Sequence, residues 1–258
     1  MFLEEIVRSV DERVGRLLPV QSYLRQKAEA MPSGRSLCQA LRQGPTRPAV
    51  IAECKHRSPS KGWLTGSYDP MAQAQYYAKA GAAAISVLTE PQFFAGSLEH
   101  LAAVRSVVPL PVLRKDFTRH EVQLYQARAA GADAVLLIVR IIEDDKRLHD
   151  LWQTATDLGL DVLVEVHSAS EVDRALALEA PLIGVNNRDL DTFDTRLAFS
   201  AEMARILPGE TIKISESGIK TVADVQWLAA QGFDGVLMGE ALMRGTPILE
   251  ALPHDPYR

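Results

Sequence analysis

The chain has 258 residues, of which 47% are hydrophobic and 24% are charged, so it can build a sizeable core. Its net charge of -5 argues against a nucleic-acid-binding surface, and no apolar run reaches the roughly 18 residues that a membrane span needs. The two cysteines, Cys38 and Cys54, lack metal-ligand spacing, and the N-terminus lacks a signal-peptide pattern. We therefore expect a cytoplasmic protein with no metal site and no membrane or nucleic-acid partner.

The first 48 residues have the pattern of a helical extension. Residues 2–30 repeat apolar side chains at helical spacing, so one face of the segment is apolar. Residues 31–48 are interrupted by glycine and proline, which indicates a connector with one short helix at 36–42.

From residue 49 onward, apolar runs alternate with segments of helical periodicity. The expected strands are 49–54, 84–88, 111–113, 134–139, 161–166, 182–185, 211–214 and 235–238. The expected helices are 70–80, 98–107, 121–130, 144–158, 170–178, 196–207, 222–230 and 242–252. Continuous apolar strands that alternate with amphipathic helices are typical of a parallel sheet covered by helices.

A glycine that recurs at regular spacing favours a (β/α)8 barrel over a doubly wound open sheet. Gly81, Gly131 and Gly232 each follow the end of an expected helix, with two residues between the glycine and the next strand, and their spacings are multiples of about 25 residues. Eight such units predict an α/β protein with a (β/α)8 TIM barrel at 49–258, preceded by the extension at 1–48, as a single domain. A doubly wound open sheet is the alternative, but it usually has a glycine-rich loop after its first strand, where this chain has Glu-Cys-Lys-His.

The stretch 111–117, Pro-Val-Leu-Arg-Lys-Asp-Phe, places three charges at the end of a short buried strand. Thr118 to Glu121 then forms a capping-box pattern, which predicts the start of a helix. Lys115 would stand on a rigid support between the two elements, with its ammonium in a crevice. An ordinary solvated turn is the alternative for this stretch taken alone.

Similar polar residues recur at the ends of the other expected strands. In a TIM barrel these ends meet around one mouth, where the active site is built. The strand-end residues are Glu53, Lys55, Thr89, Glu90, Lys115, Arg140, Glu165, Asn186, Asn187, Arg188, Glu216, Ser217, Gly218, Gly239 and Glu240. We expect them to form a shared polar site, with independent surface positions as the alternative.

Two features of this set predict acid–base chemistry. Glu53 and Lys55 are two residues apart in an extended segment, so their side chains point to the same face. Glu165 lies between two valines, an environment that tends to raise a carboxyl pKa towards that of a general acid or base. A salt bridge that only orders the core is the alternative for Glu165.

The last two units have the small residues of a phosphate site. Ser217-Gly218 and Gly239-Glu240 leave backbone N–H groups open, and barrels commonly bind phosphate at the loops after strands 7 and 8. The basic loop 55–66 could close over an anionic ligand, or it could be a solvated loop. Phe93, Phe94 and Phe117 add aromatic rings near the same rim, which indicates a ligand with a flat apolar part, although Phe93 and Phe94 could also pack between helices.

Taken together, these segments resemble the indole-3-glycerol phosphate synthase family. The matching motifs are 51–62, 86–90, 113–117, 163–167, 184–190, 215–219 and 239–244. They run in the family's order over residues 50–245, and the leading helix fits the family's N-terminal segment. The resemblance implies a TIM barrel that converts 1-(2-carboxyphenylamino)-1-deoxyribulose 5-phosphate to indole-3-glycerol phosphate by ring closure, decarboxylation and dehydration.

The resemblance also implies roles for individual residues. Lys115 is expected to protonate the substrate carbonyl, Glu165 to stabilise the cationic intermediate or act as a base, and Lys55 to bind substrate and assist dehydration. The other expected catalytic residues are Glu53, Asn186 and Glu216. The expected substrate- and phosphate-binding residues are Ser58, Ser217, Gly218, Gly239, Glu240 and Arg188. The expected walls of the aromatic-ring pocket are Pro59, Phe94, Phe117 and Leu190.

The same resemblance implies no metal or organic cofactor, because a protonated carbonyl and the loss of CO2 suffice. A small sugar phosphate is the expected partner, and a monomer is the expected state. Two alternatives remain open: a barrel like phosphoribosylanthranilate isomerase, which gives no reason for two lysines at 55 and 115, and a non-catalytic barrel that binds a phosphorylated ligand.

Overall fold

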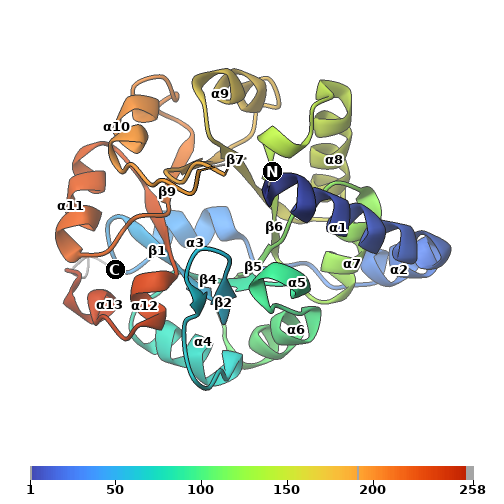
Figure 1. Ribbon diagram of the computed structural model, residues 1–258, viewed down its shortest axis with the longest axis horizontal. Helices are drawn as coiled ribbons and strands as arrows, with labels where there is room; N and C mark the ends of the chain where they lie inside the picture. Colours follow the sequence, from blue (N-terminus) through green and yellow to red (C-terminus); the bar gives the residue numbers. More distant parts are fainter. Residues whose placement is uncertain (1, 191, 254–258) are drawn as a thin grey trace.

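A computed structural model of the chain describes residues 2–190 and 192–253. It contains a closed barrel of eight parallel strands, with helices around it (Figure 1). The barrel strands are β1 (Ala49–Cys54), β4 (Ala84–Leu88), β5 (Val112–Lys115), β6 (Ala134–Ile138), β7 (Asp161–Val166), β8 (Leu182–Asn186), β9 (Ile212–Glu216) and β10 (Gly235–Met238). Because β1 pairs with both β4 and β10, the sheet has no free edge, which confirms the barrel and rules out the open sheet.

The strands form where the sequence is continuously apolar, because both of their faces are covered. Every residue of β1, β4 and β6 is buried. Three strands extend further than expected at their carboxyl ends: β5 continues to Lys115, β8 to Asn186 and β9 to Glu216. These ends carry polar side chains, which interrupt the apolar pattern while the backbone pairing continues.

Seven helices cover the outside of the barrel at the positions expected, and each bound agrees with the expected one or differs from it by one to three residues. They are α4 (Pro70–Lys79), α6 (Leu98–Val107), α7 (Glu121–Ala129), α8 (Asp145–Asp157), α9 (Ala169–Leu176), α10 (Ala198–Ala204) and α11 (Val222–Ala230). The short helix α5 (Pro91–Phe94) and the 3-10 turn η2 (Val139–Ile141) lie between strands and helices.

Two predictions about helix ends are wrong. The cap of α7 is not Thr118 but His120, whose Nδ1 accepts the N–H of Val122, while the Gln123 side chain accepts the His120 N–H. The single helix expected at 242–252 is two, α12 (Glu240–Met243) and α13 (Ile248–Ala251). Between them Gly245 adopts a φ of 78°, a conformation that ends a helix.

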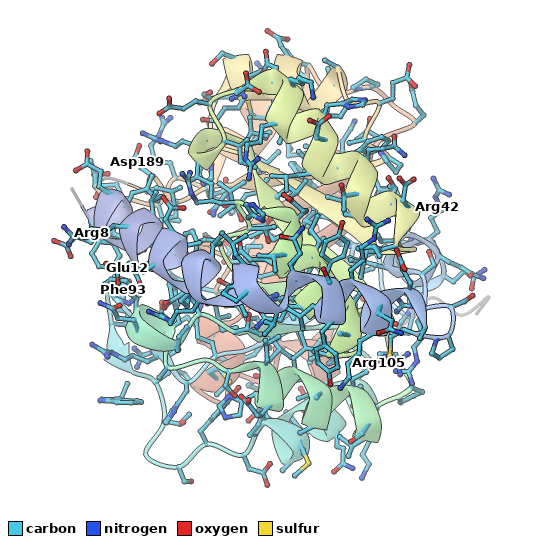
Figure 2. The ribbon with its side chains drawn as sticks, turned by 90° about the vertical axis from the view of Figure 1, so that its right-hand side faces the viewer. Arg8, Glu12, Arg42, Phe93, Arg105 and Asp189 are labelled. Carbon is cyan, nitrogen blue, oxygen red and sulfur yellow. The ribbon has the colours of Figure 1, made fainter. Side chains whose placement is uncertain are left out.

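The N-terminal extension is helical but broken. Its elements are α1 (Phe2–Leu17), the 3-10 turn η1 (Leu18–Val20), α2 (Gln21–Glu29) and α3 (Leu37–Gln43). The predicted helix at 2–30 is interrupted at η1 by a proline, which cannot continue the hydrogen bonding of a helix. Figure 2 shows α1 and α2 as one band across the flank of the barrel, with Arg8, Glu12 and Phe93 near one end and Arg42 and Arg105 towards the other.

The buried face of α1 seats it on the barrel. Ile6, Val10 and Val14 are buried, and α2 packs against α7. Arg13 reaches the buried carboxylate of Asp116, the residue after Lys115, at 2.9 Å. Within the described residues, no helix is long and apolar enough to cross a membrane.

Candidate active site

A cavity of about 780 Å³ opens at the carboxyl ends of the barrel strands. It is lined by all of the predicted site residues except Ser58. These residues come from elements far apart in the sequence, and the closed barrel brings them to one mouth. Of the strand-end residues, Thr89, Glu90, Arg140 and Asn187 do not line this cavity, whereas the others share it.

Lys115 is at the centre of the charged cluster. Its Nζ lies 3.0 Å from Glu165 Oε2 and 3.4 Å from Glu216 Oε2. Because side chains alternate along β5, its neighbours Arg114 and Asp116 form a separate buried ion pair. Burial opposes charge on Lys115, but the surrounding carboxylates outweigh it and raise the pKa of the ammonium, so Lys115 is charged at neutral pH.

Glu165, on β7, is held by three groups. Its Oε2 accepts from Lys115, its Oε1 accepts from Asn186 Nδ2 at 3.1 Å, and His167 Nε2 lies 3.2 Å from the same Oε1. Burial favours the neutral acid, but the charges of Lys115 and His167 outweigh it and lower the pKa of Glu165. The expected rise in this pKa is therefore wrong, because the flanking valines matter less than the donors at the carboxylate itself.

The pKa of Glu216, on β9, is shifted in the opposite direction from that of Glu165. Burial, together with the charges of Glu165 and Glu53, raises the pKa of Glu216 to about 8, although Lys115 works against this. Gly184 on the neighbouring β8 leaves the room for this carboxylate, since a Cβ there would collide with Glu216 Oε1. The cluster thus combines an ionised carboxylate with one that is largely protonated at neutral pH.

Glu53 and Lys55 form a second pair at the end of β1, with 2.6 Å between Glu53 Oε1 and Lys55 Nζ. The same-face prediction is confirmed, since both side chains line the cavity. Gly239 faces this pair, and a Cβ at Gly239 would lie 2.5 Å from Glu53 Oε1 and 3.1 Å from Lys55 Nζ. The absence of a side chain at Gly239 therefore leaves the room that this pair occupies.

The turns after β9 and β10 form the neighbouring part of the cavity wall, since β10 pairs with β1. Ser217 and Gly218 both adopt left-handed backbone conformations, with φ of 67° and 79°. Gly239 is the N-cap of α12, and no side chain caps the first turn of this helix, so its first amides have no side-chain acceptor there. Besides Lys55 and Lys115, the basic residues that line this cavity are Lys61, Arg188, Lys220 and Arg244.

Ser58 and some of the strand-end residues do not line the cavity. Ser58 is buried in a hairpin formed by β2 (Arg57–Ser58) and β3 (Gly62–Trp63), whereas Ser60 and Lys61 of the same loop line the cavity. Glu90 is also buried, and its carboxylate accepts the first N–H groups of α5. Neither the hairpin nor this cap could be predicted from strand spacing alone.

Apolar side chains line another part of the wall. Phe94 and Phe117 lie with ring centroids 6.0 Å apart, and Pro59 and Leu190 line the same cavity. Sequence reasoning missed the contribution of α1, which supplies Phe2, Leu3 and Ile6. Other cavity-lining residues outside the predicted site include Ser60, Lys61, Phe193, Thr195, Lys220 and Arg244. The apolar face of the first helix was the available signal, but its docking place is a long-range property.

A lysine–carboxylate centre at the mouth of a TIM barrel, with aromatic and cationic walls, defines an enzyme of the barrel class that acts on a small anionic ligand. Residues 3–252 match the family model described as indole-3-glycerol phosphate synthase. The chain is 46% identical over 260 residues to the indole-3-glycerol phosphate synthase of Carboxydothermus hydrogenoformans, covering 98% of each chain. It is 45% identical over 261 residues to that of Exiguobacterium sibiricum, covering 99% of each.

The chain therefore belongs to the indole-3-glycerol phosphate synthase family. This family comprises carboxy-lyases of tryptophan biosynthesis. The family resemblance read from the sequence motifs is confirmed.

Proposed function

We propose that the chain converts 1-(2-carboxyphenylamino)-1-deoxyribulose 5-phosphate to indole-3-glycerol phosphate, with release of CO2 and water. The observation that carries the proposal is the contact of 3.0 Å between Lys115 Nζ and Glu165 Oε2 inside the cavity. Closing a ring onto a carbonyl requires a proton donor and a negative charge that faces the developing cation. These two side chains supply both.

Lys115 donates a proton to the carbonyl oxygen of the substrate as the new carbon–carbon bond forms. The developing alkoxide is a strong base, so an ammonium with a raised pKa can still protonate it. Glu165 stays ionised next to the positive charge that builds up on the substrate. Loss of CO2 then restores the aromatic ring, and loss of water completes the indole.

The other residues that line the cavity match the carboxylate, the phosphate and the aromatic ring of the substrate. Lys55 binds the substrate carboxylate or phosphate and assists dehydration, while Glu53, Asn186 and Glu216 complete the polar network. The phosphate is held by the amides of Ser217, Gly218, Gly239 and Glu240 and by the charge of Arg188. The ring lies against Pro59, Phe94, Phe117 and Leu190.

Ser58 supports the loop from its buried position, and Ser60 and Lys61 face the ligand in its place.

The test is to mix the purified protein with the carboxyphenylamino sugar phosphate and to record indole absorbance together with CO2 release. We expect both to appear in equal amounts. Binding of the product without CO2 release would favour the non-catalytic barrel. Turnover of phosphoribosylanthranilate instead would favour the isomerase alternative.

We further propose that the extension and the barrel work as one domain, as a cytoplasmic monomer without cofactor. The small acidic chain and the two cysteines, which are free in the structure, support this proposal. Light scattering on a sizing column is expected to give the mass of one chain. Activity is expected to survive exhaustive dialysis against EDTA, and a loss that added metal restores would contradict the proposal.

A further inference from the structure

His167 follows the last residue of β7, and its ring lies between two carboxylates. Its Nε2 lies 3.2 Å from Glu165 Oε1, and its Nδ1 lies 3.4 Å from Glu171 Oε2 on α9. The side chain is 2% exposed and does not line the cavity. It therefore reaches the candidate site only through Glu165.

Both ring contacts are ion pairs rather than well-aligned hydrogen bonds. Burial lowers the pKa of the His167 ring, but the carboxylates of Glu165 and Glu171 outweigh burial and raise it to about 9. The charged groups around the ring are Glu171 on α9 and Glu165 on β7. Behind Glu165 lie Lys115 of β5 and Glu216 of β9. The ring is thus a second buried cation at Glu165, next to Oε1, whereas Lys115 contacts Oε2.

We propose that His167 is a positioning residue that keeps Glu165 ionised and directed at Lys115 during turnover. This inference rests on the proposed function. When Lys115 gives its proton to the substrate, it loses its charge, and Glu165 loses the cation at Oε2. The imidazolium at Oε1 remains, so Glu165 does not take up a proton at the moment when the substrate becomes cationic.

The local hydrogen bonding allows the ring to be tested apart from the helix end. Glu171 Oε2 accepts the backbone N–H of His167 at 2.7 Å, and Ser168 caps α9 by accepting the N–H of Glu171. A substitution of the His167 side chain leaves both backbone contacts available. Loss of α9 is therefore not an expected consequence of removing the imidazole.

His167→Asn is the central variant, because it removes the positive charge and keeps a polar side chain. We expect its kcat to fall about tenfold, less than the ~10²-fold or more typical of a group that transfers the proton itself, with KM changed less than about twofold. The acid limb of its kcat profile is expected to move upwards by about one pH unit, since Glu165 has lost a neighbouring cation. His149→Asn, at a half-exposed surface histidine on α8, is the matched control and is expected to change neither quantity.

An unchanged kcat and acid limb in His167→Asn would overturn the proposal, as would a rise in KM alone. Wild-type turnover in the same assay separates the two hypotheses: an inactive wild type contradicts the proposed function, whereas an active wild type with an indifferent variant contradicts the role of His167.

If the variant does not fold, a measurement on the wild-type protein tests whether the His167 ring is charged at neutral pH. In a nitrogen-15 NMR titration, one of the six histidine rings is expected to remain an imidazolium at neutral pH and to titrate near pH 9. Titration of all rings near the ordinary value of about 6.5 would overturn the proposal.

Discussion

Lys115 combines two properties that rarely occur together in a lysine: its side chain is 15% exposed, yet it keeps its charge. An isolated buried ammonium would release its proton, so the carboxylates of Glu165 and Glu216 are what keep it available as an acid. Asp116 and Arg114, its chain neighbours, are paired with each other and do not compete for it.

Lys115→Met tests this role at the residue scale. We expect kcat to fall by about 10²-fold or more, because general acid catalysis typically contributes at least that factor. The measurement is the initial rate of indole formation under saturating substrate, with a thermal melt to show that the variant folds. Lys146→Met, at a side chain 81% exposed on α8, is the control and is expected to be fully active. A loss below about tenfold in Lys115→Met would remove Lys115 as the acid.

The raised pKa of Glu216 predicts that the stability of the folded protein depends on pH. Its folded-state pKa is raised to about 8, so between its ordinary value of 4.5 and pH 8 the folded protein binds a proton that the unfolded chain releases. Stability from this group is present below pH 4.5 and is lost as pH rises towards 8.

Glu216→Gln removes that dependence. We expect the free energy of unfolding of the variant, relative to wild type, to increase between pH 5 and pH 8 by on the order of 1–3 kcal/mol, since one pKa unit corresponds to about 1.4 kcal/mol. Urea unfolding at the two pH values measures it. A constant difference between the two proteins would show that Glu216 is ionised throughout.

At the scale of elements, the turn after β10 depends on a glycine for space. Gly239→Ala would place a Cβ against the Glu53–Lys55 pair, so we expect kcat/KM to fall about tenfold or more while the melting temperature changes little. Gly209→Ala is the matched control, because no atom lies within 4 Å of the Cβ that it adds. Equal activity in both alanine variants would contradict the claim that this pair must be held in place.

The sequence predicted most strongly those elements that local patterns determine. The bounds of β1, β4, β7, β10, α6 and α11 agree with the expected ranges, because apolar runs and helical periodicity are local signals. The break in the helix at 242–252 was missed, although Gly245 and Pro247 were visible, because the pattern of apolar residues continues across them.

The candidate site was predictable for residues fixed by strand register and not for those fixed by tertiary packing. Lys115, Glu165 and Asn186 lie on strands, so their positions around the mouth follow from the barrel. Phe2 reaches the cavity only through the docking of α1, where its ring packs against Phe93 and Phe193 with centroids 5.2 Å apart from each. The raised pKa expected for Glu165 was wrong because it depended on partners from other strands.

At the scale of the whole molecule, the extension is fastened to the barrel next to the proposed catalytic lysine. Asp116 is fully buried, and although burial opposes its charge, Arg114 and Arg13 outweigh that effect and hold its pKa well below the usual range. Arg13 comes from α1, whereas Arg114 is on β5. The ion pair therefore links the two parts of the chain that frame the cavity.

Arg13→Leu is expected to lower the free energy of unfolding by about 1–3 kcal/mol, less than for a wholly unpaired buried charge because Arg114 remains. For a chain of this length the melting temperature should fall by about 2–4 °C per kcal/mol. Arg25→Leu breaks an exposed pair with Glu29 and is expected to cost under about 1 kcal/mol. Equal melting temperatures for the two variants would show that the Asp116 contact does not fasten the extension.

The most direct test of the account is a crystal structure with a substrate analogue whose keto group is reduced to a hydroxyl. We expect the hydroxyl oxygen about 2.6–3.2 Å from Lys115 Nζ. We expect the Glu165 carboxylate to lie next to the carbon that carries this hydroxyl, and the phosphate to lie at the turns after β9 and β10. An analogue bound with its hydroxyl out of reach of Lys115, or with its phosphate away from the turns after β9 and β10, would contradict the account.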